Sequence, residues 1–532
     1  MFEKKIFRLL SLLIASVFCA GLTGCGTDAA APASSLTART AATEETASSV
    51  PKYIFLFIGD GMSYPQIQCT NYYLNARANG TSLGGNGAIL QQENALSFLD
   101  FPVAGSAQTF DSTSYCPDSS SCATAIATGH KTYSSSLNMD EIGTVAYETI
   151  AEKLRQQNGY RIGLVTTVNL NHATPAAFYA HQPSRTNYYE IGLEMVDSGV
   201  DYLAGGALLT PTGANNDQPD LYELAQQAGY TVTRTQAESE AVTADTGKVL
   251  LVDEHPADSG SMAYEIDREE GAWSLTDYVD KGIEVLDNDT GFFMMVEGGK
   301  IDWACHGNDA ATAVNDVKAL SDAVSRAVEF YDEHPDETLI LVTGDHETGG
   351  LTIGYAGTNY DTFLQNLAGQ KLSFTRFTND YVTAYRENNT PFSQVLADVQ
   401  DLFGLTTEAA SGQQGETGVT TDSVNSHPSG VTSGSLVMTD LELQQLQDAY
   451  NRTMEGIEEP TQEEYLLYGS YDPLTVTITH ILDNKSGVHF SSYSHTGLPV
   501  AVFALGVGQQ EFCGFYDNTH IYDALAALTG VA

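Results

Sequence analysis

Five short apolar runs predict strands that are buried on both faces of a sheet. They occupy residues 53–58, 161–168, 292–296, 338–343 and 499–505. Each run is nearly continuous instead of alternating with polar residues, which is typical of a central strand covered by helices on both sides. Helical repeats of apolar residues lie between the runs. This order predicts an α/β protein with a mainly parallel central sheet flanked by helices on both faces.

The helices expected between the strands are amphipathic. Residues 147–158 and 220–228 are each followed by a glycine, which commonly terminates a helix. Further helices are expected at 275–286 and 314–331, where apolar residues recur every three or four positions.

Residues 357–488 interrupt this alternation. They hold two helical patterns, at 392–403 and 441–454, separated by a polar tract at 408–434 that is rich in Gly, Ser and Thr. We expect an inserted rim region with a mobile loop inside it, within one catalytic domain that spans residues 51–532.

Metal-binding and hydroxyl side chains cluster where the predicted strands end. Asp60 follows the first strand, Thr174 the second and Glu297 the third, Asp345 and His346 follow the fourth, and His495 shortly precedes the fifth. Polar sites of open α/β sheets lie outside the carboxyl ends of the strands. We therefore expect these side chains to form one site.

The stretch at 291–309, GFFMMVEGGKIDWACHGND, carries the most chemistry. Asp302 and His306 are four residues apart, so one face of a helical turn presents both. A carboxylate and an imidazole at that spacing can hold a divalent metal, while Glu297 points toward another. The alternative is a solvated aspartate and a histidine that caps a helix.

Ser119 lies in a run of small residues, PDSSSCATA, that leads into a helix ending at Gly129. A helix N-terminus favours an anion, but a serine hydroxyl needs a base or a metal to become a nucleophile. The sequence contains no G-x-S-x-G motif, which counts against an ordinary Ser-His-Asp hydrolase. The alternative is that Ser119 only caps the helix.

The charge of the chain restricts its partners. The 532 residues include 23 basic and 68 acidic ones, a net charge of −45. Residues 1–24 carry a net +2, so a chain without them would carry −47. Such a surface repels nucleic acid, and an anionic substrate needs a local positive charge such as a bound metal.

The N-terminus predicts export and anchoring. Basic residues and then an apolar stretch form a signal peptide at 1–24. It ends in Leu-Thr-Gly-Cys, which resembles the lipobox of bacterial lipoproteins, so Cys25 would carry a lipid that anchors the protein to the membrane outside the cytoplasm. Residues 25–50 read as a flexible tether. The alternative is an ordinary cleaved signal.

Cys116 and Cys122 could form a disulfide, which their spacing does not establish.

Six motifs together resemble alkaline phosphatases, and they occur in the family's order. They are GDGM at 59–62, DSSSCAT at 118–124, HATPAAFYAHQPSR at 172–185, VEGGKIDWACH at 296–306, DHETGG at 345–350 and SHTG at 494–497. The resemblance implies a phosphatase that hydrolyses small-molecule phosphate monoesters through a phosphoserine intermediate. It also implies a homodimer, the common state of relatives.

The resemblance implies two zinc ions and one magnesium ion. The first zinc set would be Asp302, His306 and His495, the second Asp60, Asp345 and His346, and the magnesium set Asp60, Thr174 and Glu297. Imidazole-containing sets suit zinc, whereas an all-oxygen set suits magnesium.

The same resemblance makes Ser119 the nucleophile and Arg185 the residue that binds two phosphate oxygens. One well-known branch of the family has Asp and Lys where this chain has His172 and Trp303. We expect His172 near the third metal and Trp303 in the wall of the substrate pocket. The sequence does not decide which metal occupies that third site.

Three alternatives compete with the phosphatase interpretation. A sulfatase needs a C/S-x-P-x-R context, which Cys116-Pro117-Asp118 does not provide. A phosphodiesterase would gain little from Arg185, which pairs best with a dianionic terminal phosphate. A surface lipoprotein that sequesters zinc or phosphate is the non-enzymatic alternative.

Overall fold

The computed structural model describes residues 50–79, 92–358, 361–407, 435–456 and 460–532. The signal peptide, Cys25, almost all of the tether and the tract at 408–434 lie outside these residues. No helix in the described part of the chain is long and apolar enough to cross a membrane. Cys116 and Cys122 are both free thiols.

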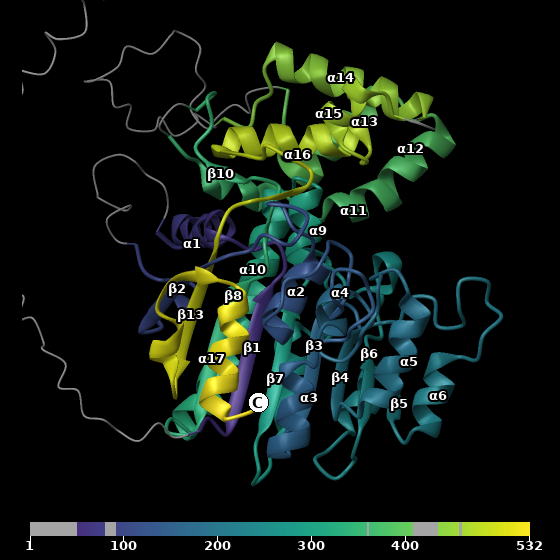
Figure 1. Ribbon diagram of the computed structural model, residues 1–532. Coiled ribbons are helices and arrows are strands. Elements are labelled where there is room, and N and C mark those ends of the chain that lie inside the picture. Colours follow the sequence, from purple (N-terminus) through teal and green to yellow (C-terminus); the bar gives the residue numbers. More distant parts are fainter. Residues whose placement is uncertain (1–49, 80–91, 359–360, 408–434, 457–459) are drawn as a thin grey trace, which may run out of the picture. The chain divides into compact units, whose positions relative to one another are not determined.

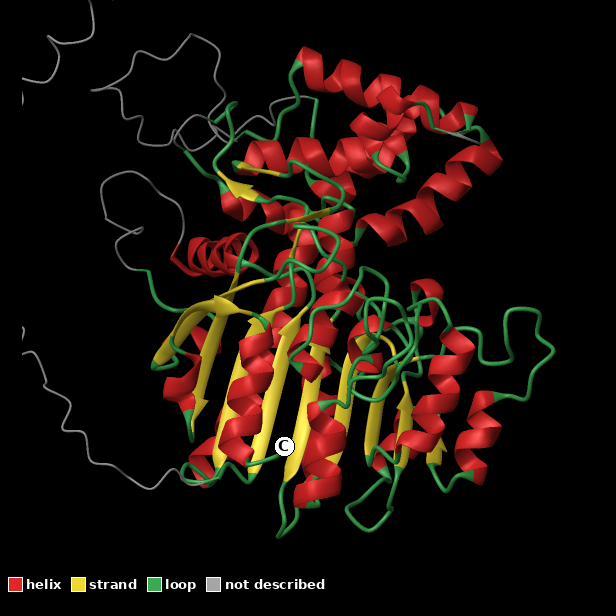
Figure 2. Cartoon of the chain, viewed as in Figure 1, coloured by secondary structure: helices red, strands yellow, loops and turns green. Residues whose placement is uncertain are grey.

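A sheet of ten strands forms the centre of the domain (Figures 1 and 2). Neighbouring strands are parallel except around β13, which is antiparallel to both β8 and β2. In sheet order the strands are β14 (Gly514–Asp517), β2 (Val103–Gln108), β13 (Val500–Gly506), β8 (Thr338–Gly344), β1 (Tyr53–Gly59), β7 (Phe292–Gly298), β3 (Arg161–Asn169), β4 (Tyr202–Gly206), β6 (Val249–Val252) and β5 (Thr231–Thr233). The predicted α/β class is confirmed.

Both faces of the sheet are buried, which explains why the central strands show no alternation. In β1 the side chains of Tyr53, Phe55 and Phe57 join one apolar cluster, and those of Ile54, Leu56 and Ile58 join the other. The first cluster includes residues of α1 (Tyr64–Asn79), α8 (Leu275–Leu286) and α10 (Ala310–Glu333). The second includes residues of α2 (Ser119–Thr128), α3 (Ile150–Lys153), α5 (Tyr188–Ser198), α6 (Leu221–Gln227) and α17 (Thr519–Thr529).

Helices form at the predicted places, but some bounds differ. α8 has the expected bounds, whereas α10 spans Ala310–Glu333 and not 314–331. α3 begins at Ile150 and not at residue 147, and from Leu154 to Asn158 the helix continues as a π-helix. Thr149 and Glu152 form a capping box, in which each side chain bonds the other's backbone N–H, and this fixes the start.

Strand register brings the predicted polar residues to one edge. Gly59 of β1 pairs with Gly298 of β7 and with Gly344 of β8. Asp60 and Asp345 come directly after two of these paired glycines, so they lie side by side. β13 runs in the opposite direction and therefore starts at this same edge, which explains why His495 precedes its strand while the other polar residues follow theirs.

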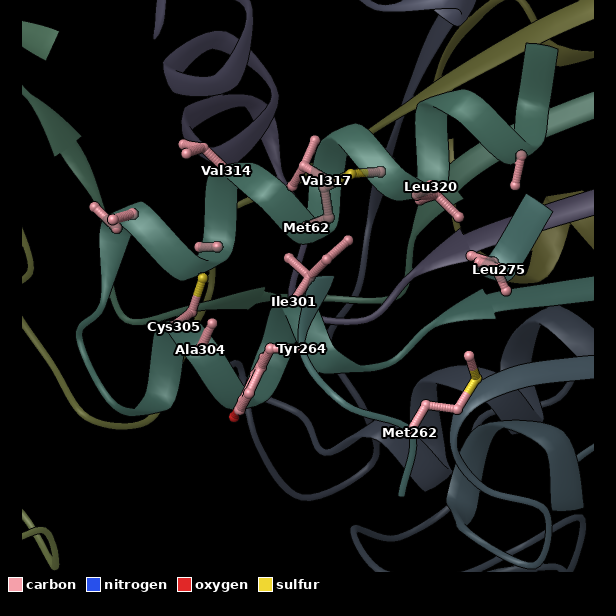
Figure 3. Close-up of a cluster of buried hydrophobic side chains, with 14 of the residues drawn as sticks. Met62, Met262, Tyr264, Leu275, Ile301, Ala304, Cys305, Val314, Val317 and Leu320 are labelled. Atoms are coloured by element: carbon pink, nitrogen blue, oxygen red, sulfur yellow. The ribbon is translucent and has the colours of Figure 1, made fainter. Parts of the chain in front are cut away.

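α9 (Lys300–His306) has one apolar side and one polar side. Ile301, Ala304 and Cys305 belong to the apolar cluster that also contains residues of α10 (Figure 3). Asp302 and His306 occupy the other side, toward the sheet edge. Burial of the apolar side thus fixes the direction in which the two polar side chains point.

The rim region leaves and rejoins the domain at one place. β10 (Thr352–Ile353) pairs antiparallel with β11 (Val488–His489), with Thr352 opposite His489. The described residues between these strands form helices beyond the carboxyl edge of the sheet (Figure 1). These helices are α11 (Phe374–Arg376), α12 (Thr383–Asn388), α13 (Phe392–Phe403), α14 (Asp440–Glu455), α15 (Gln462–Tyr468) and α16 (Pro473–Ser486).

A half-buried imidazole holds the segment that leads to Arg185. His181 lies between Glu152 of α3, with Nε2 3.4 Å from a carboxylate oxygen, and Glu194 of α5, with Nδ1 3.5 Å away. Burial disfavours the charged imidazole, but the two carboxylates outweigh it and raise the pKa of His181 to about 10. The protonated ring therefore joins α3 to α5.

Replacement of this histidine is expected to cost stability in a pH-dependent way. The contribution of His181 is complete below its ordinary pKa of about 6.5 and is lost as pH rises toward about 10. We expect His181→Gln to lower the free energy of unfolding by about 1.5–3 kcal/mol at pH 6, and to approach the wild type at pH 10. Guanidinium unfolding at several pH values measures this, with exposed His255→Gln as control. A deficit that is the same at pH 6 and pH 10 would contradict the assignment.

Candidate active site

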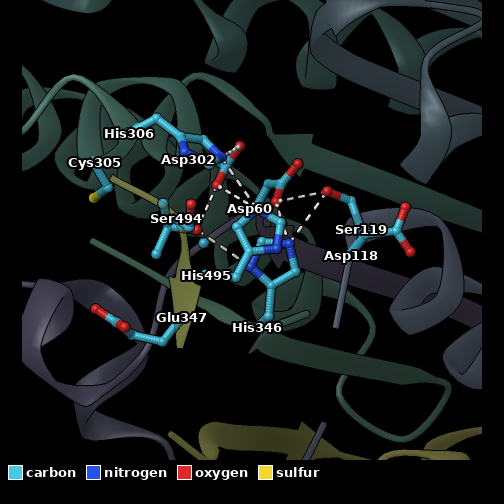
Figure 4. A network of polar contacts seen from close by, with 12 residues as sticks. Asp60, Asp118, Ser119, Asp302, Cys305, His306, His346, Glu347, Ser494 and His495 are labelled. Carbon is cyan, nitrogen blue, oxygen red and sulfur yellow. Dashed lines mark hydrogen bonds and ion pairs between the residues drawn. The ribbon is translucent and has the colours of Figure 1, made fainter. Parts of the chain in front are cut away.

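Ser119 is the first residue of α2 and does not cap it. The cap is Asp118, whose carboxylate accepts the Ser121 N–H at 3.1 Å. The Ser119 hydroxyl is thereby free to face the sheet edge, where Oγ lies 3.2 Å from His346 Nε2 and 3.5 Å from Asp60 Oδ1 (Figure 4). The residue is only 2% exposed. The capping alternative for Ser119 is therefore wrong.

Asp60, Asp345 and His346 meet beside this hydroxyl. His346 Nε2 is 3.3 Å from Asp60 Oδ1 and 3.3 Å from Asp345 Oδ2, and all three side chains are buried. Gly61 makes the approach possible, because its φ of +70° forms the turn and a Cβ there would lie 2.9 Å from the Cα of Asp302. These ligand atoms lie close enough together to hold one metal ion.

Asp302, His306 and His495 form the adjacent group. His306 Nε2 lies 3.1 Å from His495 Nε2 and 3.4 Å from Asp302 Oδ2. The other ring nitrogens lie 2.6 Å from carbonyl oxygens, His306 Nδ1 from that of Tyr493 and His495 Nδ1 from that of Pro117. A carbonyl only accepts, so each Nδ1 carries a hydrogen, and in a neutral ring Nε2 then presents its lone pair. Two neutral rings with lone pairs 3.1 Å apart repel, and a proton or a metal cation between the two nitrogens removes the repulsion.

The two groups are in direct contact. The rings of His346 and His495 stack, with centroids 3.7 Å apart. Asp302, His346 and His495 also have their ligand atoms close enough together for one ion. The short strands β9 (Glu347–Thr348) and β12 (His495–Thr496) pair antiparallel, with His495 opposite Thr348. The Thr348 hydroxyl donates to Asp302 Oδ1.

Unpaired oxygens mark a further place for a cation. Thr166 donates to Glu297 Oε2, which leaves the second Glu297 oxygen without a partner. In the described part of the chain, four buried oxygens of this edge have no hydrogen-bond partner: Asp60 Oδ2, Thr174 Oγ1, Glu297 Oε1 and Asp345 Oδ2. Buried oxygens without donors are costly unless a cation binds them. The donor set therefore fits hard cations.

The pKa values of the carboxylates at this edge are also consistent with a cation-binding site. Burial, followed by the neighbouring carboxylates, raises the pKa of Asp60 well above its usual range. Burial and Asp302 raise the pKa of Asp345 to about 8, and burial raises that of Glu297 to about 7. Burial also opposes charge on Asp302, but the imidazoles beside it outweigh burial and lower its pKa. Without metal, the edge would retain protons at neutral pH.

Arg185 lies beside Ser119 and is held from two sides. Its Nη1 donates to Asp118 Oδ2 at 3.0 Å, and its Nη2 lies 3.1 Å from His172 Nε2. Burial and the guanidinium lower the pKa of His172 to about 3, so the imidazole is a neutral acceptor. The His172 ring meets Trp303 edge to face at 6.0 Å between centroids. Arg185 keeps three of its five N–H groups for a ligand.

Two residues outside the predicted set support the site. Glu347 accepts the Gln66 amide at 2.7 Å and the backbone N–H of Gly350 at 3.1 Å, and Thr496 also donates to it. It thus ties together the segments that carry His346 and His495. The position of Glu347 inside the DHETGG motif was the sequence feature that could have predicted this role.

The second is Lys300, a fully buried lysine. Its ammonium lies 3.1 Å from Asp258 Oδ1 and 3.0 Å from Ser261 Oγ. It also lies 4.5 Å from the centroid of the Trp303 ring. Both oxygen partners lie about 40 positions earlier in the chain, so local sequence carried no signal for this role.

Comparison with known proteins agrees with these motifs. The alkaline phosphatase family model matches residues 51–203 and 200–531. Alkaline phosphatase 4 of Bacillus subtilis strain 168 is 29% identical over 477 residues, which cover 88% of this chain and 86% of that protein.

Solved structures share the fold. The cold-active alkaline phosphatase of a psychrophilic Shewanella species aligns with a TM-score of 0.68 and 27% identity, covering 90% of this chain and 99% of its own. The Thermus thermophilus alkaline phosphatase aligns with a TM-score of 0.69 and 23% identity, covering 95% and 96%. The chain belongs to the alkaline phosphatase family of metal-dependent phosphate monoester hydrolases.

Proposed function

We propose that this phosphatase transfers the phosphoryl group of its substrate to Ser119 and then to water. The observation that carries the proposal is the position of Ser119 Oγ, buried at a helix start and 3.2 Å from His346 Nε2. In the first step the serine proton passes to solvent, the Oγ–P bond forms, the P–O bond to the alcohol breaks, and the alcohol oxygen takes up a proton from solvent. In the second step a water oxygen bonds to phosphorus and gives up a proton to solvent, the Oγ–P bond breaks, and the serine oxygen is protonated again as phosphate leaves.

The chain's own residues prepare this transfer. The first turn of α2 places backbone N–H groups and the positive end of the helix dipole beside Ser119. Asp118 caps that helix and also orients Arg185, so one carboxylate aligns the nucleophile with the phosphate-binding guanidinium. Burial of the pocket excludes water and strengthens each of these interactions.

Metal ions are part of the proposal. Asp302, His306 and His495 would hold one zinc ion, Asp60, Asp345 and His346 a second, and Asp60, Thr174 and Glu297 a magnesium ion. Bound there, the ions would supply the positive charge that stabilises a serine oxyanion, the leaving oxygen and the phosphate. The lone pairs and unpaired oxygens described above support these assignments.

Arg185 favours monoesters over diesters. Its free N–H groups can pair with two non-bridging oxygens of a dianionic terminal phosphate. A diester has one charge fewer and a second organic group in place of one of those oxygens. Turnover of mono- and bis-p-nitrophenyl phosphate therefore separates the two functions. Faster hydrolysis of the diester would contradict the proposal.

We further propose that the mature enzyme is a homodimer outside the cytoplasm, anchored by a lipid on Cys25. The basic and apolar leader and the Leu-Thr-Gly-Cys sequence support the anchor. The enzyme is expected in the membrane fraction of its cells, and Cys25→Ser is expected to move it to the soluble fraction. Mass spectrometry of the N-terminal peptide measures the lipid. An unmodified Cys25 in mature, membrane-bound enzyme would overturn the anchor.

Removal of the nucleophile is expected to abolish turnover but not metal binding. Ser119→Ala should lower kcat for p-nitrophenyl phosphate by about a thousandfold or more, because no other group forms the covalent intermediate. Elemental analysis of the purified variant should still find the wild-type metal content. Ser121→Ala is the matched control, since its hydroxyl bonds Asp111 at 2.8 Å and not the metal-binding edge. Near-wild-type kcat in Ser119→Ala would remove this serine from the mechanism.

Metal uptake is expected to release protons, and more of them at pH 7 than at pH 9. In metal-free enzyme the raised pKa values of Asp345, about 8, and Glu297, about 7, keep protons on the site at neutral pH. These protons must leave when zinc and magnesium bind. Titration calorimetry of chelator-treated enzyme in buffers of different ionisation enthalpy counts them. Equal release at both pH values would contradict metal binding by these carboxylates.

A further inference from the structure

A cavity of about 490 Å³ opens next to the metal-binding edge. Trp303 and His306 of α9 form one side of it, and Phe374, Thr378 and Tyr471 of the rim region form the other. His306 belongs to the first proposed zinc set, and Trp303 contacts His172, the partner of Arg185. The cavity therefore lies next to the proposed phosphate site, and the rim region supplies part of its lining.

Aromatic rings form the walls of this cavity. Phe374 meets Tyr471 nearly perpendicularly, with centroids 5.5 Å apart, and Tyr264 lies 5.9 Å from Phe374. The buried Lys300 ammonium lies 4.5 Å from the Trp303 centroid and 3.8 Å from that of Tyr264, so it holds both rings in place. Aromatic walls with fixed geometry favour a ligand group that is itself flat and apolar.

The charges around the cavity further restrict which ligand groups it can bind. The acidic residues of its lining are Asp258 and Asp472, and neither lysine nor arginine is among the described lining residues. Asp258 pairs with the buried Lys300, and Asp472 pairs with Arg386, which is partly exposed. Apart from the proposed zinc on His306, which would serve the phosphate, a second anionic group on the substrate would find no lysine or arginine in the described part of this lining. Thr375, Asn379 and Ser470 offer hydrogen bonds instead.

We propose that this cavity binds the organic group of the substrate alcohol and selects phosphate monoesters whose alcohol carries an uncharged aromatic ring. The role rests on the phosphatase function proposed above, and it makes Tyr471 and Phe374 specificity-determining residues supplied by the rim region. The family resemblance already predicted Trp303 in the wall of the substrate pocket, whereas the contribution of Phe374 and Tyr471 from the rim region follows only from the fold.

Benzyl phosphate and ethyl phosphate test this selectivity, since their leaving alcohols have similar acidity and differ mainly in the ring. We expect kcat/KM of the wild type for benzyl phosphate to exceed that for ethyl phosphate by about tenfold or more, because the ring leaves water for the aromatic walls. A carboxylate on the ring, as in 4-carboxybenzyl phosphate, should remove most of this advantage.

Variants of the wall assign the effect to the cavity. Tyr471→Ala should reduce the benzyl-to-ethyl ratio by about fivefold to tenfold, and Tyr471→Phe should restore most of it because the ring is retained. Tyr465→Ala is the matched control, since Tyr465 is an exposed tyrosine of α15 outside the cavity lining. Its ratio should equal that of the wild type.

The outcomes separate this inference from the function beneath it. Equal kcat/KM for benzyl and ethyl phosphate in the wild type, or an unchanged ratio in Tyr471→Ala, would overturn the role of the cavity and leave the phosphatase mechanism standing. Failure of the wild type to hydrolyse either ester would overturn the proposed function and the cavity's role with it.

Discussion

Groups that repel one another are held together at one buried edge of the sheet, and the rest of the structure depends on how that repulsion is relieved. Asp60, Asp345 and Glu297 are fully buried there, and the facing nitrogens of His306 and His495 are 3.1 Å apart. Protons can neutralise such a cluster in part, as the raised carboxylate pKa values indicate. The proposed divalent cations would neutralise it more completely and would also pair with the oxygens that lack hydrogen-bond partners.

The fold supplies the geometry through ordinary packing. Parallel register aligns Gly59 with Gly344, and this strand pairing alone makes the next residues, Asp60 and Asp345, neighbours. The apolar side of α9 is buried against α10, and this directs Asp302 and His306 toward the same edge. Without cations, the buried carboxylates lower the stability of the fold, and hydrophobic burial elsewhere holds them together. Cation binding at this edge would offset part of the free-energy cost of burying these carboxylates.

Much of this arrangement could be predicted from the sequence, because it follows from burial. The central strands lack alternation since both faces are covered, and their ends place the polar residues. The strands β4, β5, β6 and β14 were not predicted because they are short. β2 alternates between buried and exposed positions, but its sequence VAGSAQ consists mostly of small and polar residues and gives a weak apolar signal. The contact of Lys300 in α9 with Asp258 joins segments 42 positions apart, so only the fold could show it. His172 and Arg185 lie in one motif, but their side-chain contact also follows only from the fold.

The central claim is that cations occupy this edge beside Ser119. Anomalous diffraction measured on both sides of the zinc absorption edge, from crystals of active enzyme, tests it most directly. The account predicts zinc peaks between the Nε2 atoms of His306 and His495, and between Asp345, His346 and the Ser119 oxygen. Fully active crystals without anomalous density at either place would contradict it.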